Sequence, residues 1–305
     1  MSSKLKVLPP SKEEKVKPRL PSWLRMSIPR GGNLFKTNSI LETYNLNTVC
    51  EEAKCPNRME CYSRKTATFL ALGKACTRAC GFCEIDFDKA PKLPEKDEPL
   101  RIAMSVKELG LKHVVITMVA RDDLPDEGAS HIAAIIREIR NHHSTITIEV
   151  LTSDFSGKKE CIDLVLEERP EIFNHNIETV RTLSPRVRHK AQYERTLTVL
   201  HHAAMSGKCT FVKSGIMVGL GETEEEVRAT LHDLKGAGCS IVTIGQYLQP
   251  SRRKLRVKDF ISPKIFKAYE AYGHEIGIRH MYCGPFVRSS YNAAQVLQSA
   301  QTKAS

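Results

Sequence analysis

The sequence lacks a hydrophobic run long enough to cross a membrane. None of its apolar stretches approaches the ~20 residues that a transmembrane helix needs. Its charged N-terminus, MSSKLKVLPPSKEEKVKPRL, has no apolar core of the kind that a secretory signal carries. We therefore expect no membrane span, no secretion and a cytoplasmic location. In a reducing compartment the cysteines would remain thiols rather than form disulfides.

Two further absences count against a histidine metal site and against nucleic-acid binding. Eleven histidines are scattered without companion ligands in metal spacing, so they do not indicate a histidine metal site. No RNA-binding motif or basic strip interleaved with aromatic residues occurs, so we expect no nucleic acid as partner. Of the net charge of +11, residues 1–30 contribute +6 through eight Lys or Arg and two Glu. A solvated tail is favoured there over electrostatic steering.

The 305 residues alternate short runs rich in Val, Ile, Thr or Phe with longer amphipathic stretches. The expected strands are 68–72, 113–119, 145–152, 172–176, 210–218 and 240–247. The expected helices between them are 99–110, 128–142, 158–168, 193–207, 223–236 and 262–276. Six strand–helix units in strict alternation predict an α/β fold with a parallel sheet. Periodicity leaves open a partial barrel or an open doubly wound sheet.

The chain divides into four segments on this interpretation. Residues 1–45 form a basic N-terminal tail and an irregular covering segment. Residues 46–66 are polar, and Pro56 favours loops or short helical turns over a long helix. The α/β body occupies residues 67–278, and residues 279–305 form a C-terminal segment.

Six of the ten cysteines fall within residues 50–83 and form two triplets. The upstream triplet has the spacing C-x4-C-x5-C and consists of Cys50, Cys55 and Cys61. The downstream triplet has the spacing C-x3-C-x2-C and consists of Cys76, Cys80 and Cys83. Soft ligands concentrated in this way are typical of metal sites.

The downstream triplet follows the first expected strand, at the sheet edge where parallel α/β proteins place their sites. Three thiolates on one compact loop can hold three irons of a 4Fe–4S cube and leave the fourth iron open. A four-thiolate zinc site would need another Cys or His close by, and the following residues 84–86 provide none. The spacing therefore favours an iron–sulfur cluster over structural zinc.

The pattern C-x3-C-x-aromatic-C, with Phe82 as its aromatic residue, resembles the radical S-adenosylmethionine (radical SAM) superfamily. The resemblance implies a partial (β/α)6 barrel in which the open iron binds S-adenosylmethionine, with Phe82 beside the cofactor. The stretch GIMVGLGE resembles the superfamily's glycine-rich strand end near the adenine, and its expected cofactor contacts are Gly215, Gly219 and Glu222.

Several polar residues at expected strand ends are weaker candidates. Thr117, Asn176 and Glu178 are expected to contact the methionine or ribose of the cofactor, with capping or turn hydrogen bonds as the alternative. Four charged residues at loop positions are interpreted as surface ion pairs: Arg121, Asp122, Arg188 and Lys213.

Longer blocks in the same order closely resemble the lipoyl synthase family over residues 47–293. They include NTVCEEAKCPN, ACTRACGFC, RDDLPDEGA, KSGIMVGLGET and RSSY. The resemblance implies an auxiliary 4Fe–4S cluster on the upstream triplet, closed from the C-terminal segment by a serine oxygen of RSSY. That serine maps to Ser290, with Ser289 beside it, and it is the residue that we expect to be both a metal ligand and catalytic.

The resemblance also implies the reaction and its partners. Two sulfur atoms would be inserted at C6 and C8 of an octanoyl chain held on a lysine, with the auxiliary cluster as sulfur donor. The implied cofactors are two 4Fe–4S clusters and S-adenosylmethionine. The implied partners are octanoylated lipoyl carrier domains of 2-oxoacid dehydrogenase complexes or the glycine cleavage H protein, and an electron donor such as flavodoxin or ferredoxin.

The residues leave two other functions open. One is another radical SAM enzyme with an auxiliary cluster, which inserts sulfur or modifies peptides or tRNA. The RSSY element and the lack of an appended RNA-binding domain count against it. The other is a ferredoxin-like electron carrier or a zinc-binding interaction module, for which six βα units are more than is needed.

Overall fold

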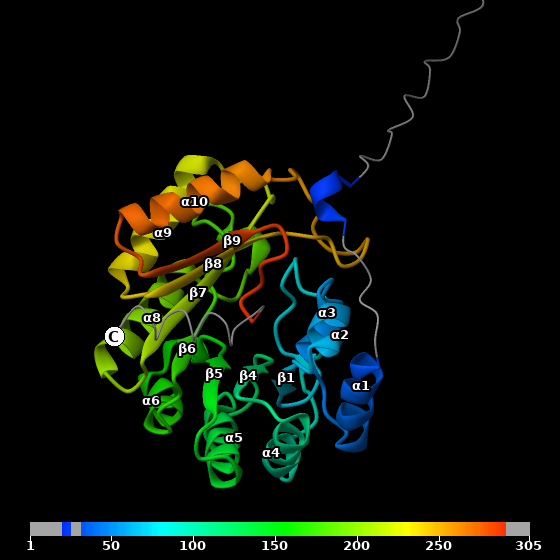
Figure 1. Cartoon of the computed structure of the whole chain (residues 1–305). Coiled ribbons are helices and arrows are strands. Elements are labelled where there is room, and N and C mark those ends of the chain that lie inside the picture. The colour runs from blue at the N-terminus through cyan, green and yellow to red at the C-terminus, as the bar shows by residue number, and fades with distance from the viewer. Residues whose placement is uncertain (1–19, 26–31, 291–305) are drawn as a thin grey trace, which may run out of the picture.

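The computed structural model describes residues 20–25 and 32–290. Its body is a parallel sheet of seven strands, in which each strand pairs with the next one along the chain. Figure 1 shows these strands side by side. They are β1 (Thr68–Ala71), β4 (His113–Met118), β5 (Thr147–Leu151), β6 (Ile172–Asn174), β7 (Phe211–Val218), β8 (Ile241–Gln246) and β9 (His280–Gly284).

A helix connects each strand to its successor. These helices are α4 (Glu98–Leu109), α5 (Ala129–His142), α6 (Lys159–Glu167), α8 (Tyr193–Ser206), α9 (Glu224–Gly236) and α10 (Pro263–Glu275). All six expected strands and all six expected helices are present, with bounds that differ from the prediction by at most two residues. In the described ranges 20–25 and 32–290, none of the helices combines the length and apolar character that crossing a membrane requires.

The order of the strands decides between the two architectures. A doubly wound sheet reverses its strand order at a switch point, whereas this order runs one way from β1 to β9. Because crossovers between parallel strands are right-handed, an order that never reverses places all connecting helices on one face. Figure 1 shows the helices outside the curved sheet. The fold is therefore a partial barrel, and its inner face is available for a site.

Shorter elements complete the fold. They are η1 (Ser22–Leu24), α1 (Asn33–Thr43), α2 (Val49–Glu52), α3 (Arg58–Ser63), β2 (Ala75–Cys76), β3 (Asp86–Phe87), η2 (Phe155–Gly157) and α7 (Ser184–Val187). The short α2 and α3 agree with the helical turns predicted for residues 46–66.

Two differences from the prediction lie at the ends of the barrel. The irregular covering segment predicted before residue 45 is wrong for 33–43, which form α1. Thr37, Ile40 and Leu41 are buried there, and their i, i+3, i+4 spacing is that of a helix face. The seventh strand, β9, lies in the segment HMYCG and pairs with β8. Its short run has no strong apolar alternation, so the sequence gives little sign of it.

The barrel interior is built in layers. At the amino ends of the strands, Ile172, Phe211 and Ile241 form an apolar plug. Next comes a buried ion pair, in which the Lys213 ammonium lies 2.9 and 3.0 Å from the two carboxylate oxygens of Glu149. Inward-facing residues of a strand are two apart, so Gly215 follows Lys213 in the next layer towards the carboxyl ends. That layer lines a cavity. The ion pair therefore forms the base on which the site rests.

Replacing Lys213 with Met should lower the free energy of unfolding by ~3–5 kcal/mol in urea, because Glu149 would keep a buried charge without its partner. Burial alone raises the pKa of Glu149, but Lys213 and His113 together lower it to about 2. The double variant K213M/E149L removes both charges and should recover most of the loss. A double variant as unstable as K213M would contradict this account.

Candidate functional site

A cavity of about 520 Å³ lies at the carboxyl ends of the strands. Its walls include inward-facing residues of three strands, Thr117 of β4, Gly215 of β7 and Thr243 of β8. Lys54 and Pro56 line it and are also exposed, so the cavity reaches the surface. Its volume falls within the ~300–1,000 Å³ typical of small-molecule sites.

All three thiols of the downstream triplet line this cavity, together with Phe82. Arg78 ties their loop to the barrel. Its Nε donates to both carboxylate oxygens of Asp122 at 3.0 Å, and its Nη1 lies 2.7 Å from Asp154 Oδ1. Burial lowers the pKa of Arg78, but these carboxylates raise it above its ordinary value. A buried charge with complete partners fixes a position, so the network holds the loop in place.

Two short helices present the upstream triplet. The hydroxyl of Thr48 caps α2 by accepting a hydrogen bond from a backbone N–H of its first turn, and α2 carries Cys50. Lys54, with a φ of 51°, turns the chain towards Cys55. Cys50 and Cys55 line the cavity, whereas Cys61 of α3 packs against the hydrophobic core. Five of the six triplet thiols therefore line one cavity.

The C-terminal segment closes over the triplets. Asn57, beside the upstream triplet, donates its amide to the Phe286 carbonyl at 2.7 Å, across 229 residues of sequence. Ser289 donates its hydroxyl to Asn176 Oδ1 at 2.7 Å. Ser290 lines the cavity, and within the described residues its hydroxyl has no hydrogen-bond partner. The RSSY element is thus held at the cavity wall through its first serine.

The close approach of this segment requires glycine on two strands. A Cβ on Gly215 would lie 2.6 Å from Ser289 Oγ and 2.9 Å from Asn176 Oδ1. A Cβ on Gly245 of β8 would overlap the Val287 carbonyl oxygen. Gly215, an expected cofactor contact, lines the cavity and also makes room for the C-terminal segment.

Glu178 projects from a strained backbone. Its φ of 67° lies in the left-handed region, and two backbone hydrogen bonds, to Gly215 at 2.9 Å and from Met217 at 2.8 Å, hold it there. Its carboxylate accepts from the Asn176 amide at 3.1 Å. Burial raises the pKa of Glu178, while Arg188 opposes that shift. Strain of this kind is concentrated at binding sites.

Three charged residues line the cavity without a salt bridge to any described residue: Glu178, Arg188 and Arg288. Arg188 donates to the carbonyls of Asn176 and Ile177 at 2.8 and 2.7 Å. Burial lowers the pKa of Arg288, and the nearby Cys55 and Glu178 oppose that effect. Because charges withdrawn from water need counter-charges, these three groups suit a ligand that carries both signs of charge.

Most of the predicted cofactor contacts line the cavity, namely Phe82, Thr117, Asn176, Glu178 and Gly215. The other two, Gly219 and Glu222, lie outside its lining. The Glu222 carboxylate accepts from the backbone N–H groups of Gly219 and Leu220, the latter at 2.9 Å, and so closes the turn after β7. A contact between these two residues and the cofactor remains a prediction.

The charged residues interpreted as surface ion pairs differ from that prediction. Arg121, Arg188 and Lys213 are buried, with exposed fractions of 0%, 4% and 0%. Asp122 is half-buried and holds Arg78. Sequence reasoning gave no role to Arg78, and it included Arg288 only as part of the RSSY element. The sequence did contain a signal for Arg78, because it lies between two of the expected metal ligands. A charge at such a position needs a buried partner.

Burial makes four of the six triplet thiols weaker acids. All ten cysteines are free. Burial raises the pKa of Cys80 to about 11 and that of Cys83 to about 12. Burial likewise raises the pKa of Cys50 to about 11 and that of Cys61 to about 12. Because iron binds the thiolate, filling these sites must release protons.

The donor sets fit clusters better than single ions. Within residues 20–25 and 32–290, no group of three His, Cys, Asp or Glu side chains is arranged to hold one metal ion. Each thiolate of a cube binds a different iron, so a cluster needs a wider arrangement than one ion does. The three free thiols of the downstream triplet all line a cavity of this size, and their soft donors suit a 4Fe–4S cluster with a small-molecule cofactor.

Known proteins resemble the chain over almost all of its length. The Radical SAM superfamily matches residues 70–234, and the N-terminal domain of lipoyl synthase of the radical SAM family matches residues 5–55. The lipoyl synthase of Protochlamydia amoebophila is 62% identical over 287 residues, which cover 93% of this chain and 89% of that relative. The chain belongs to the lipoyl synthase family. The lipoyl synthase of Chlamydia felis is 52% identical over 296 residues, covering 97% of this chain and 95% of the relative.

Solved structures support the fold of this family member. HydG, a maturase of the [FeFe]-hydrogenase, aligns with a TM-score of 0.56 at 17% identity, covering 76% of this chain and 54% of HydG. Methylornithine synthase aligns with a TM-score of 0.53 at 14% identity, covering 77% and 80%. The family and the fold class predicted from the sequence are both confirmed. The chain is a radical SAM enzyme, and this superfamily implies one 4Fe–4S cluster and S-adenosylmethionine.

Replacing Gly245 with Ala should displace the C-terminal segment, because the new Cβ would overlap the Val287 carbonyl. We expect the free energy of unfolding to fall by ~1–3 kcal/mol and amide hydrogen exchange to accelerate in residues 284–290. Gly236→Ala is the matched control, since its added Cβ meets no atom within 4 Å. Equal exchange rates in the two variants would contradict the close packing of the C-terminal segment against Gly245.

Proposed function

We propose that this lipoyl synthase family member holds two 4Fe–4S clusters and inserts two sulfur atoms into a protein-bound octanoyl chain, at C6 and C8. Cys76, Cys80 and Cys83 would hold the radical SAM cluster. The upstream triplet with Ser290 would hold an auxiliary cluster. When bound, the first cluster with S-adenosylmethionine supplies a carbon-centred radical that removes hydrogen, and the second supplies sulfur.

One observation carries the proposal, namely that a single cavity is lined by all three downstream thiols, by Cys50 and Cys55 of the upstream triplet, and by Ser289 and Ser290. Hydrogen abstraction and sulfur transfer at the same carbon need their reagents within reach of one substrate. Two clusters in separate cavities would instead suit electron transfer along a chain. The shared cavity therefore supports the sulfur-inserting function over an electron carrier.

The hydrogen bonding supports Ser290, rather than Ser289, as the fourth auxiliary ligand. Ser289 uses its hydroxyl proton in the bond to Asn176, at 2.7 Å. Ser290 lines the cavity, and its hydroxyl makes no bond to the described residues. A hard oxygen donor among soft thiolates is a weak ligand, which suits a cluster that is taken apart as it gives up sulfur.

The remaining lining residues include charged and apolar side chains. We assign the amino and carboxylate groups of S-adenosylmethionine to Glu178, Arg188 and Arg288, because these charges lack ionic partners among the described residues. We assign the octanoyl chain to the neighbourhood of Val49 and Leu248, which line the cavity beside the upstream triplet and the β8 end. An apolar chain gains free energy there as water is displaced.

We further propose the substrate and partners that this reaction needs. The octanoyl group would arrive on a lysine of a lipoyl carrier domain, from a 2-oxoacid dehydrogenase complex or the glycine cleavage H protein. Flavodoxin or ferredoxin would supply the electron. Ten free thiols suit a reducing compartment, which supports a cytoplasmic site of action.

Converting the upstream triplet to Ala should separate the two proposed chemistries. The unchanged chain, reconstituted anaerobically, should bind roughly eight irons and add two sulfurs to an octanoyl-lysyl peptide, measured by mass spectrometry. The variant should keep about half the iron and still form 5′-deoxyadenosine, but add no sulfur. The downstream triple Ala variant should also keep about half the iron, yet form no 5′-deoxyadenosine. Loss of all iron from either variant would contradict two independent clusters.

Ser290→Ala and Ser289→Ala form a matched pair one residue apart. We expect S290A to keep cleavage of S-adenosylmethionine but to lose sulfur insertion by at least ~100-fold, because the auxiliary cluster lacks its fourth ligand. S289A loses only the bond to Asn176 and should retain most of both activities. The opposite ranking, with S289A the more damaged in sulfur insertion, would identify Ser289 as the ligand.

A further inference from the structure

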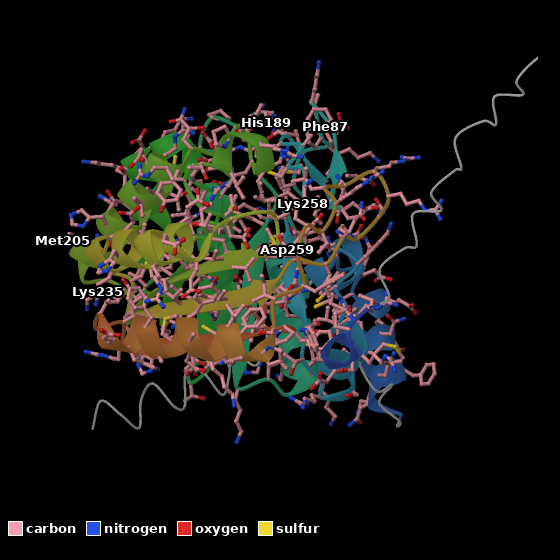
Figure 2. The ribbon with its side chains drawn as sticks, turned by 90° about the horizontal axis from the view of Figure 1, so that it is seen from above. Phe87, His189, Met205, Lys235, Lys258 and Asp259 are labelled. Atoms are coloured by element: carbon pink, nitrogen blue, oxygen red, sulfur yellow. The ribbon has the colours of Figure 1, made fainter. Side chains whose placement is uncertain are left out.

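The connection between β8 and α10 carries an unusual concentration of positive charge. Residues 251–258, SRRKLRVK, contain five Lys or Arg and no acid. Arg252, Arg253, Arg256 and Lys258 are exposed, and Lys254 is half-buried. None of the five forms a salt bridge with a described residue. Figure 2 shows Lys258 with its neighbour Asp259, the acid that follows this run.

A sixth cation joins the group from another element. Arg186 of α7 lines a small surface hollow together with Arg256 and Lys258, over an apolar floor that includes Leu220 and Leu255. The basic rim is defined here as these six cations: Arg186, Arg252, Arg253, Lys254, Arg256 and Lys258. The nearby Glu84 offers them little compensation, because Lys54 and Ser251 already occupy its carboxylate at 2.7 and 2.8 Å.

The basic rim is fixed to the edge of the cavity. Gln249 and Pro250, which precede it directly, line the cavity. The Leu255 N–H donates to the Gly81 carbonyl at 2.9 Å, inside the downstream thiol loop. Tyr247 donates its hydroxyl to the Leu255 carbonyl at 2.8 Å. These hydrogen bonds therefore fix the position of the basic rim beside the cavity that the thiols line.

Six like charges that form no salt bridge with a described residue repel one another, and this repulsion is relieved when an acidic surface covers them. A substrate tethered to a protein must bring that protein to the cavity mouth. We propose that the basic rim is the docking surface for an acidic carrier protein, which presents its octanoylated lysine to the cavity. This inference rests on the proposed function and adds where, and by what chemistry, the carrier binds.

A protein fits this surface better than a nucleic acid does. Proteins that bind single strands combine basic residues with aromatic side chains on which bases stack. The run 251–258 has no aromatic residue. Two of its cations, Arg256 and Lys258, lie with Arg186 around a small apolar hollow, and this mixture of charge and apolar surface resembles the rim of a protein–protein interface.

The test compares two substrates of one enzyme. The first is an octanoylated lipoyl domain with a net negative surface, and the second is a short uncharged octanoyl-lysyl peptide. For R252E/R253E we expect KM for the domain to rise roughly tenfold, with kcat little changed, because surface charges act mainly on encounter. KM for the peptide should stay within about twofold, since the peptide cannot reach the rim. Added salt should raise KM for the domain only.

The control variant, K107E/K112E, makes the same change in net charge at the opposite end of the barrel, where Lys107 lies in the last turn of α4 and Lys112 directly precedes β4. It should leave both KM values unchanged. Equal effects of R252E/R253E on the two substrates, or equal effects of the two variants on the domain, would overturn the docking surface. So would tighter binding of a short oligonucleotide than of the lipoyl domain at one salt concentration.

The melting temperature of each variant should equal that of the unchanged enzyme, which establishes that the variants are folded. R252Q/R253Q, which removes charge without reversing it, should raise KM for the domain by an intermediate factor. Failure of the proposed function gives a different result. In that case the unchanged enzyme adds no sulfur to either substrate, whereas failure of the docking surface leaves both substrates converted and the variants indistinguishable from it.

Discussion

The site depends on one close approach, that of the C-terminal segment to the inner face of the barrel. β7 and β8 present glycine at residues 215 and 245, where any side chain would overlap Ser289 or the Val287 carbonyl. With those side chains absent, a segment from the far end of the sequence reaches across the strand ends and meets the upstream helices at Asn57. Thiols of both triplets, from different elements, thereby line one cavity.

Buried charge has two different roles around that cavity. Arg78 has carboxylate partners on two sides and acts as scaffold, because a satisfied ion network has nothing left to offer a ligand. Glu178, Arg188 and Arg288 have backbone or amide hydrogen bonds but no described ionic partner. The protein bears the cost of keeping them poorly solvated, and a zwitterionic ligand would relieve it. Completeness of pairing thus separates supporting residues from binding residues.

The sequence allowed the repeating body to be predicted because its signals are local. The capping box of α9, in which Thr223 and Glu226 bond to each other's backbone, lies within four residues of sequence at the start of the expected helix 223–236. The thiol triplets are also local patterns. By contrast, β9 is a strand mainly because β8 offers an edge to pair with, and Arg78 is an anchor only because Asp154 folds against it. Such pairings join distant residues, so no window of sequence contains them.

The hydrogen bond between Asn57 and Phe286 joins residues that are 229 apart in the sequence. This separation sets a delay between the synthesis of the two residues. A ribosome that adds ~5–20 residues per second needs roughly 10–50 s to travel that far. During this interval the upstream thiols have been made, but the segment that covers them has not. They are open to oxidation and to stray metals until translation is almost complete. A cell that makes this chain must therefore keep those thiols reduced until the ribosome has nearly finished.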